Sequence, residues 1–157
     1  MSSTITAGAG EHYVAYCLAS LGYISALVRQ GSPTLDVLAS DTTGSRTIGI
    51  QVKTTQSALR TRGRGDNKVP HELQFPLGHH AIEKGEPGTV ICFVDLKGKS
   101  LAGAPDVYVM PVEYLLFKFS GIDVRQWSYF RLHWPIADME PFKNNWSPVI
   151  ERLGTAS

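Results

Sequence analysis

Apolar and polar positions follow two different periods along this chain. Between residues 7 and 21, Val14, Leu18 and Leu21 fall on one stripe at helical spacing, which predicts a helix. Over residues 47–53 every second side chain is apolar, as in a strand with one buried face. Helical spacing followed by strand alternation indicates an α/β protein.

The same patterns predict the remaining elements. Strands are expected over 34–39, 89–96, 107–110 and 129–134, and helices over 77–84, 112–119 and 138–146, with a further turn at 149–153. Residues 56–70 have no apolar period and are expected to form a mobile loop. Helices interleaved with strands, some of them joined as hairpins, indicate a mixed sheet with helices on both faces. Neither a repeat nor a linker divides the chain, so residues 1–157 are expected to form one domain.

Composition narrows the class of protein. Hydrophobic residues make up 43% of the 157 residues and charged residues 18%, as in a globular rather than a disordered chain. No apolar run has the length of a membrane helix, and the first residues do not resemble a signal peptide, so we expect no membrane partner and a cytoplasmic location. Cys17 and Cys92 lie in apolar segments and are expected in the core.

Charge is distributed unevenly although the formal net charge is only +1. Residues 46–68 carry several cations against the single acid Asp66. These cations are Arg46, Lys53, Arg60, Arg62, Arg64 and Lys68. Such a stripe is typical either of a surface that binds phosphate groups or of a solvated, flexible loop.

Two acids stand where apolar residues are expected. Glu11 is in line with Val14 and Leu18 on the stripe that faces the core. Burying an unpaired carboxylate is costly, so a cation, hydrogen bonds or water must accompany it, unless Glu11 only complements the dipole of the first helical turn. Asp36 interrupts the apolar strand 34–39, which indicates either metal ligation or a cap at the strand end.

Gln51 and Lys53 are two residues apart, so both project from one face of the expected strand. A helical acid, a strand acid, a hairpin and then this polar-x-Lys pair follow one another along the chain. This order would bring oxygen ligands and one amine together at one end of the sheet.

In this order of residues the chain resembles the PD-(D/E)xK nuclease superfamily, which includes restriction endonucleases and Holliday-junction resolvases. Glu11, Asp36 and Gln51-Val52-Lys53 stand at the positions of its motif, and the resemblance covers residues 7–96. It implies a restriction-endonuclease-like, three-layer α/β/α fold around a central mixed sheet. Two departures are visible: Pro33 is not adjacent to Asp36, and Gln51 replaces the usual second acid.

The resemblance also implies a function, a Mg²⁺- or Mn²⁺-dependent endonuclease or other phosphodiesterase that acts on nucleic acid, with DNA as the expected substrate. Its metal ligands would be Glu11, Asp36, Gln51 and the Val52 carbonyl, and Lys53 would orient water or neutralise charge. Nucleic acid would be bound by Arg60, Arg62, Arg64 and Lys68. Nucleases of this kind often form homodimers to reach two strands. The alternative, which Gln51 raises, is a catalytically inactive nuclease-fold module that binds nucleic acid or a protein partner.

His79 and His80 are a further pair of potential metal ligands. Adjacent residues in a helix diverge by about 100°, so we expect these histidines not to share one metal and to lie at the surface or at the start of a helix.

Overall fold

The computed structural model describes residues 3–28, 35–98, 103–126 and 130–155. The strands in these ranges are β1 Ile24–Leu27, β2 Val37–Ser40, β3 Thr47–Thr55, β4 Leu59–Arg62, β5 Val69–Leu77, β6 Val90–Asp95, β7 Asp106–Pro111 and β8 Phe130–Pro135. The helices are α1 Ser3–Ser20, α2 His80–Glu83, α3 Val112–Lys118, α4 Ile136–Met139 and α5 Ser147–Leu153, with short 3-10 turns at Gly65–Asn67, Val124–Gln126 and Glu140–Phe142.

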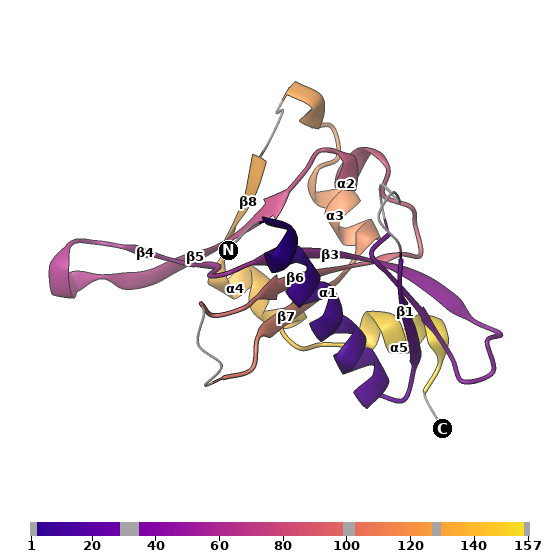
Figure 1. Cartoon of the computed structure of the whole chain (residues 1–157). Coiled ribbons are helices and arrows are strands. Elements are labelled where there is room, and N and C mark those ends of the chain that lie inside the picture. Colours follow the sequence, from indigo (N-terminus) through magenta and orange to yellow (C-terminus); the bar gives the residue numbers. More distant parts are fainter. Residues whose placement is uncertain (1–2, 29–34, 99–102, 127–129, 156–157) are drawn as a thin grey trace.

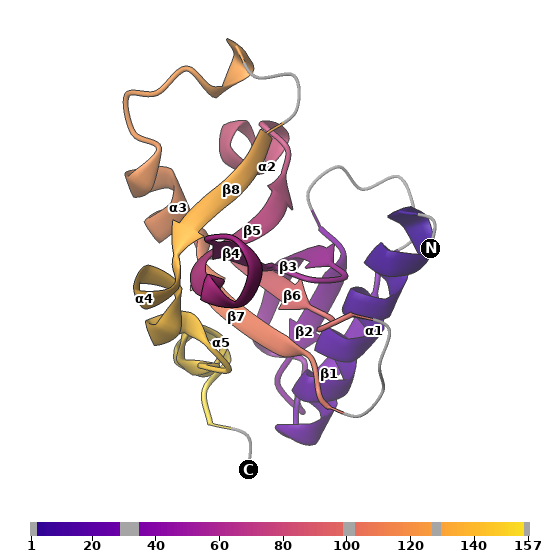
Figure 2. The same ribbon diagram turned by 90° about the vertical axis from the view of Figure 1, so that its left-hand side faces the viewer.

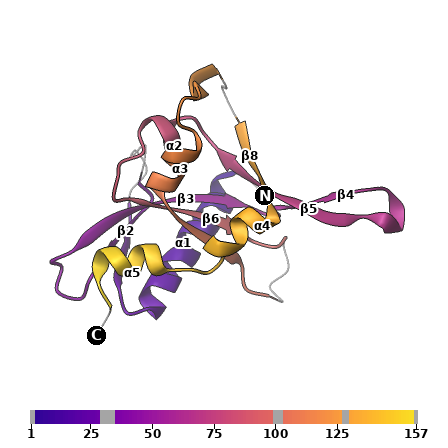
Figure 3. The same cartoon turned by 180° about the vertical axis from the view of Figure 1, so that it is seen from behind.

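The strands form two sheets. The larger has the order β1-β2-β3-β6-β7, and the smaller has the order β4-β5-β8. In the larger sheet β3 and β6 are parallel while the other neighbouring pairs are antiparallel, so the expected α/β class with a mixed sheet is confirmed. Figure 2 shows α1 on one side of this sheet and α2 and α3 on the other, and Figure 3 shows the side that carries α3, α4 and α5.

Each face of the larger sheet has its own apolar core. Val14 and Leu18 of α1 are fully buried with Ile50 of β3 in one cluster. In the second cluster, Phe93 of β6 packs with residues of α3 and of the smaller sheet, and its ring centroid lies 5.3 Å from that of Phe75. A fully buried side chain of this size contributes about 1.5–3 kcal/mol. These two clusters hold α1 and the smaller sheet against opposite faces of the larger one.

The helix α1 begins at Ser3, earlier than its apolar pattern indicated, and its end follows from a glycine. Gly22 has a φ of 89°, and its N–H donates to the Ala19 carbonyl at 3.0 Å. The Tyr23 N–H donates to the Leu18 carbonyl at 3.0 Å, which completes a Schellman motif. Tyr23 and Leu18 share a core cluster, so the motif also has its usual apolar contact.

Residues 56–70 do not form the loop that their composition predicted. They contain β4, a 3-10 turn and the start of β5, and together with the rest of β5 they form an arm that projects from the larger sheet (Figure 1). The apolar period is missing because β4 is covered on neither face: three of its four residues are exposed. Hydrogen bonding to β5, in the register Leu59↔Leu73 to Arg62↔Val69, holds the strand instead.

Other differences have equally local causes. β1 was not expected, because three of its four residues are exposed and no burial pattern marks it. The helix expected over 138–146 is shorter and lies earlier, because Pro141 cannot donate to a continuing helix and a 3-10 turn replaces it. The strands expected over 34–39 and 129–134 begin outside the described residues; β2 starts at Val37 and β8 covers Phe130–Pro135.

The cysteines and the helices bear on two further expectations. Cys92 is buried in the first core cluster as expected, whereas Cys17 is only half-buried. Among the helices in the described ranges, none is long and apolar enough to cross a membrane.

One close contact fixes how α1 sits on β3. A Cβ atom added to Gly10 would overlap the hydroxyl of Thr54 and come within 2.8 Å of its Cγ2. A side chain at position 10 would therefore push the helix away from the strand. Glycine is required here by the close approach.

Two substitutions on this helix test the contact. We expect Gly10→Ala to lower the free energy of unfolding by about 1–3 kcal/mol, because the added methyl group overpacks the helix–strand interface. Gly8→Ala, with nothing within 4 Å of the new Cβ, should raise it by about 0.5–1 kcal/mol through helix propensity. Urea denaturation measures both, and equal stabilisation by the two alanines would show that the contact is loose.

Candidate functional site

Asp36 is attached to β3 through both its backbone and its side chain. It lies just before β2, where its N–H donates to the Ile50 carbonyl at 3.0 Å. Its carboxylate oxygen Oδ2 accepts a hydrogen bond from the Val52 N–H at 2.7 Å. An ionised carboxylate offers about four lone-pair sites, so this bond leaves acceptor capacity for a cation. Asp36 is thus a strand-end cap, as one of its two interpretations held, and it can still be a ligand.

Glu11 reaches the same region from α1. It is half-buried, and burial raises the pKa of its carboxyl group above the ordinary 4.5; the negative charge of Asp36 raises it further. His12 and Lys53 act in the opposite direction, with the smaller effect. A second carboxylate close enough to change the pKa of Glu11 means that the two acids share one environment.

Lys53 completes this group. Burial lowers the pKa of its ammonium group below the ordinary 10.5, while Asp36 and Glu11 oppose that change. The structure therefore brings Glu11, Asp36 and Lys53 together where α1 and the segment that enters β2 meet β3. Each of the three groups thus lies within electrostatic range of another, and their convergence on a single site stays a prediction.

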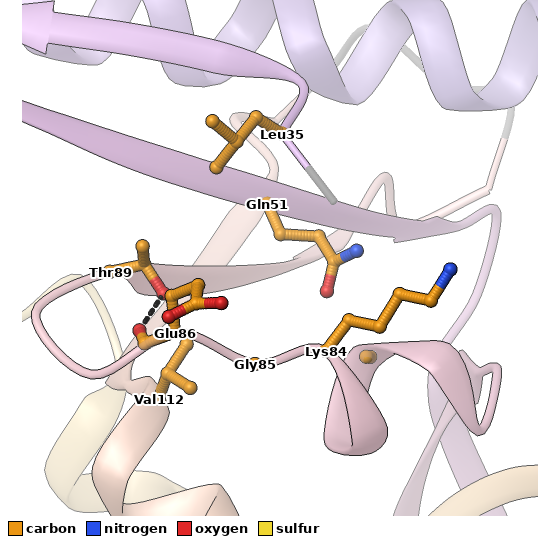
Figure 4. Close-up of a pocket in the computed structure, with 8 residues that line it drawn as sticks. Leu35, Gln51, Lys84, Gly85, Glu86, Thr89 and Val112 are labelled. Carbon is orange, nitrogen blue, oxygen red and sulfur yellow. Dashed lines mark hydrogen bonds between the residues drawn. The ribbon is translucent and has the colours of Figure 1, made fainter. Parts of the chain in front are cut away.

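Gln51 lies two residues before Lys53 and projects from the same face of β3. It is 8% exposed and lines a cavity of about 80 Å³ on the side of β3 that α2 and α3 cover. Figure 4 shows its amide pointing away from β3, with the side chains of Lys84 and Glu86 on either side of it. Glu11, Asp36 and Lys53 belong to the described residues, yet none of them lines this cavity.

The sequence pattern did not single out Lys84 and Glu86, because they stand at the end of the helix expected over 77–84, on either side of Gly85. In the structure both line the cavity that holds the Gln51 amide.

The predicted nucleic-acid-binding cations lie on the arm. Arg62, Arg64 and Lys68 are exposed near its tip, and Arg64 precedes the 3-10 turn that closes it. Arg60 lies nearer the base, and its Nε donates to the Gln74 side-chain oxygen at 2.9 Å. The cations are thus carried by a hydrogen-bonded hairpin rather than by a loop.

His79 and His80 lie at the start of a helix as expected, but the expectation that they diverge is wrong. Their ring centroids lie 4.1 Å apart, and both rings turn towards Glu83. The carboxylate oxygen Oε2 of Glu83 lies 3.7 Å from the Nε2 of His79 and 3.5 Å from the Nδ1 of His80. The 100° rotation separates the Cβ atoms, but His79 lies at the N-cap of a helix of one turn and the rings extend beyond the backbone.

These three residues can hold a metal, since one ligand atom of each lies within 4.8 Å of the others. Imidazole and carboxylate ligands suit zinc and other transition metals. The Nε of Arg125, 3.7 Å from Glu83 Oε1, already supplies a positive charge to this carboxylate. Exposed groups of this kind are common without a metal, so the geometry by itself assigns none.

Comparison with protein-family models, with curated proteins and with solved structures finds no match to the chain.

The shifted pKa values give the acid–lysine group a pH signature. A carboxyl group with a raised pKa binds its proton more tightly in the folded protein, so stability falls as pH rises from 4.5 through the folded pKa of Glu11. A lysine with a lowered pKa has the opposite slope, and stability rises with pH from its lowered pKa up to 10.5. Burial thus disfavours the charged form of both groups in the folded protein.

The variant Glu11→Gln tests this signature. We expect it to be more stable than wild type near neutral pH, because the neutral amide avoids the desolvation cost of the Glu11 carboxylate. The difference in stability should disappear as pH falls below 4.5. Urea denaturation at several pH values measures it. A less stable Glu11→Gln protein at neutral pH would show that the environment favours the charge.

Glu113→Gln is the matched control. Burial raises the pKa of Glu113, but hydrogen bonds from its own N–H, from the Gly88 N–H at 2.7 Å and from Arg152 at 2.9 Å outweigh burial and lower it. Its stabilising effect is present above 4.5 and is lost as pH falls through the folded pKa. The same change of Glu to Gln should therefore destabilise the protein near neutral pH.

Proposed function

We propose that this protein is a metal-dependent nuclease with a restriction-endonuclease-like fold. The observation that carries the proposal is the half-buried group of Glu11, Asp36 and Lys53, since two acids and an amine are kept close together at a cost in stability. Clusters of perturbed titratable groups are typical of functional sites. The mixed sheet with α1 on one side and α2 and α3 on the other supports the fold assignment.

The donor set fits a hard divalent cation. Glu11 and Asp36 provide carboxylate oxygens, and the raised pKa of Glu11 beside Asp36 indicates that a positive charge would be favourable there. Mg²⁺ prefers oxygen ligands and Mn²⁺ accepts them. In this proposal the Val52 carbonyl and the Gln51 amide oxygen complete the protein ligands. Gln51 is the weakest member, because it carries no charge and lines the neighbouring cavity.

The metal, when bound, would supply a water of lowered pKa and positive charge beside the phosphate. Lys53 would hold its ammonium group next to the reacting phosphate and neutralise the charge that develops there. Asp36 would be held in position by the hydrogen bond from the Val52 N–H, and Glu11 by the close packing of α1 against β3. The cations of the arm would bind the backbone of the nucleic acid, with DNA as the proposed substrate.

A second candidate function is a nuclease-fold module without catalysis, which binds nucleic acid or a protein partner. Gln51 favours it, since an amide in place of the usual second acid lowers the charge available for a metal. A cytoplasmic location and a homodimer also remain proposals. Cys17 and Cys92 are free thiols, which is typical of a reducing compartment, and a dimer would allow cleavage of two strands.

Two substitutions separate metal binding from catalysis. Asp36→Asn keeps an oxygen that can accept from the Val52 N–H but removes the charge, so Mg²⁺ affinity measured by calorimetry should fall at least about tenfold and cleavage should be lost. Lys53→Met should keep Mg²⁺ binding and lose about 10²–10³-fold in cleavage rate. Lys118→Met, which changes an exposed lysine of α3, is the control.

The histidine group requires its own control in these titrations. Mg²⁺ is used because it prefers oxygen ligands, and His80→Ala should leave its binding unchanged. Wild-type protein that binds nucleic acid but neither binds Mg²⁺ nor cleaves would favour the non-catalytic module. Full activity of Lys53→Met would remove this lysine from the mechanism.

Gln51→Glu tests the departure from the motif. A carboxylate at a position that is 8% exposed should destabilise the metal-free protein, because its charge is buried. If its oxygen is a ligand, Mg²⁺ should then raise the unfolding midpoint more in Gln51→Glu than in wild type. Thermal unfolding with and without Mg²⁺ measures this, and equal Mg²⁺ responses would exclude position 51 from the metal site.

A further inference from the structure

A polar cavity lies beside the acid–lysine group, between α1, the end of β3 and the smaller sheet. Its volume is about 290 Å³. Its lining contains hydroxyl, amide and guanidinium groups, and the residues are Ser3, Thr6, Thr54, Thr55, Gln56, Arg60, Gln74, Pro76 and Arg131. The cavity is therefore lined by hydrogen-bonding groups and by two positive charges, with no carboxylate among these residues.

Two arginines meet at one neutral oxygen in this cavity. The Gln74 side-chain oxygen accepts from the Arg60 Nε at 2.9 Å and from the Arg131 Nη1 at 3.1 Å. The Gln74 Nε2 lies 2.7 Å from the Nε2 of His133, whose Nδ1 lies 2.7 Å from a carboxylate oxygen of Glu72. Glu72 is thus engaged with His133, and among the described residues the Gln74 amide is the group that both arginines share.

The hydrogen-bonding capacity of the arginines points towards an additional partner. Each guanidinium has five N–H donors. Within the described residues Arg60 uses its Nε and Nη1, the latter towards the Ser57 and Leu59 carbonyls, and Arg131 uses its Nη1. Donors therefore remain on both groups. An anion with several oxygens satisfies such donors and compensates the two charges.

The position of the cavity relates it to the proposed site of cleavage. Thr54 and Thr55 line it and directly follow Lys53 on β3. One or two residues of strand correspond to about 3.3–6.6 Å. Thr55 also shares one face of β3 with Lys53, so a phosphate in the cavity would lie close along the nucleic-acid backbone to a phosphate at Lys53.

We propose that this cavity is a phosphate-binding pocket that holds a backbone phosphate next to the one at Lys53. That the pocket binds an anion follows from its own residues. The assignment of this anion to the strand that is cleaved rests on the proposed function. Arg131 and Gln74, which lie on β8 and β5, thereby join Arg60 as binding residues.

The test measures DNA binding without metal. A fluorescein-labelled duplex is titrated in EDTA at several NaCl concentrations. Arg131→Gln should weaken binding about tenfold and reduce the slope of log K against log salt by about 0.9, the value of one phosphate contact. Arg125→Gln, which removes an exposed arginine paired with Asp123 at 3.0 Å, is the control and should leave both quantities near wild type.

Gln74→Glu separates binding from folding. A carboxylate would neutralise Arg60 and Arg131 in place, so the unfolding midpoint should stay or rise while DNA affinity falls. A merely structural role of this network would move stability and leave DNA binding unchanged. If Gln74→Glu fails to fold, Arg131→Gln decides alone.

The possible outcomes are distinct. Unchanged DNA affinity and salt slope in Arg131→Gln overturn the proposal. Binding of inorganic phosphate is measured by calorimetry. If Arg131→Gln loses phosphate binding but keeps DNA binding, the proposal is also overturned, because the pocket would then bind a free phosphate compound. If wild-type protein does not cleave DNA and Arg131→Gln still weakens DNA binding, the phosphate pocket is upheld and the nuclease function is rejected. If the protein is a nuclease, Asp36→Asn should lose cleavage and keep its DNA binding in the absence of metal.

Discussion

The close approach of α1 to β3 is the constraint from which the geometry of the site follows. Gly10 has no side chain, so the helix rests directly on Thr54. Glu11 follows Gly10 and Lys53 precedes Thr54, so the same contact helps to set the distance over which the charge of Glu11 acts on Lys53. The Thr54 hydroxyl is buried without a hydrogen-bond partner among the described residues, which costs about 1–3 kcal/mol. Apolar packing of α1, and not a polar contact at this point, must therefore hold the helix in place.

Sequence predicted those parts of the fold that have one buried face. Alternation in β3 and the helical stripe of α1 were visible because Ile50, Val14 and Leu18 are buried while their neighbours along the chain are less so. The arm could not be predicted in this way. Both faces of β4 are largely exposed, and the strand depends on hydrogen bonds to β5 more than ten residues away, such as the pair Arg60↔Glu72. Local pattern carries no information about such a partner.

The candidate site was predictable only where local periodicity along the chain determines which way a side chain points. Element order and strand parity predicted that Gln51 and Lys53 share one face of β3 and that Glu11 and Asp36 are charged neighbours of Lys53, whereas the helices that cover this face depend on the packing of distant segments. Since α2 and α3 close over that face, a carboxylate at position 51 would be buried, and without a cation this costs several kcal/mol. An amide avoids that cost. The departure from the motif thus has a physical explanation in the packing of this chain, independent of whether a metal binds.

A net charge of +1 gives the molecule as a whole no long-range attraction for a polyanion, so any attraction must come from local groups. Screening limits such groups to about 8 Å at physiological salt, which favours cations arranged close together along a track. In the proposed function the cations of the arm, Arg60 and Arg131 of the pocket, and Lys53 near the end of β3 would provide such a series. β8 contributes to this series in two ways. A two-stranded hairpin alone is marginally stable, so the arm needs a further strand at its base. As the third strand of the smaller sheet β8 supports the base of the arm, and through Arg131 it supplies the second cation of the pocket. Support for the arm and charge for the pocket therefore come from the same strand, so a change that detaches β8 would remove both together.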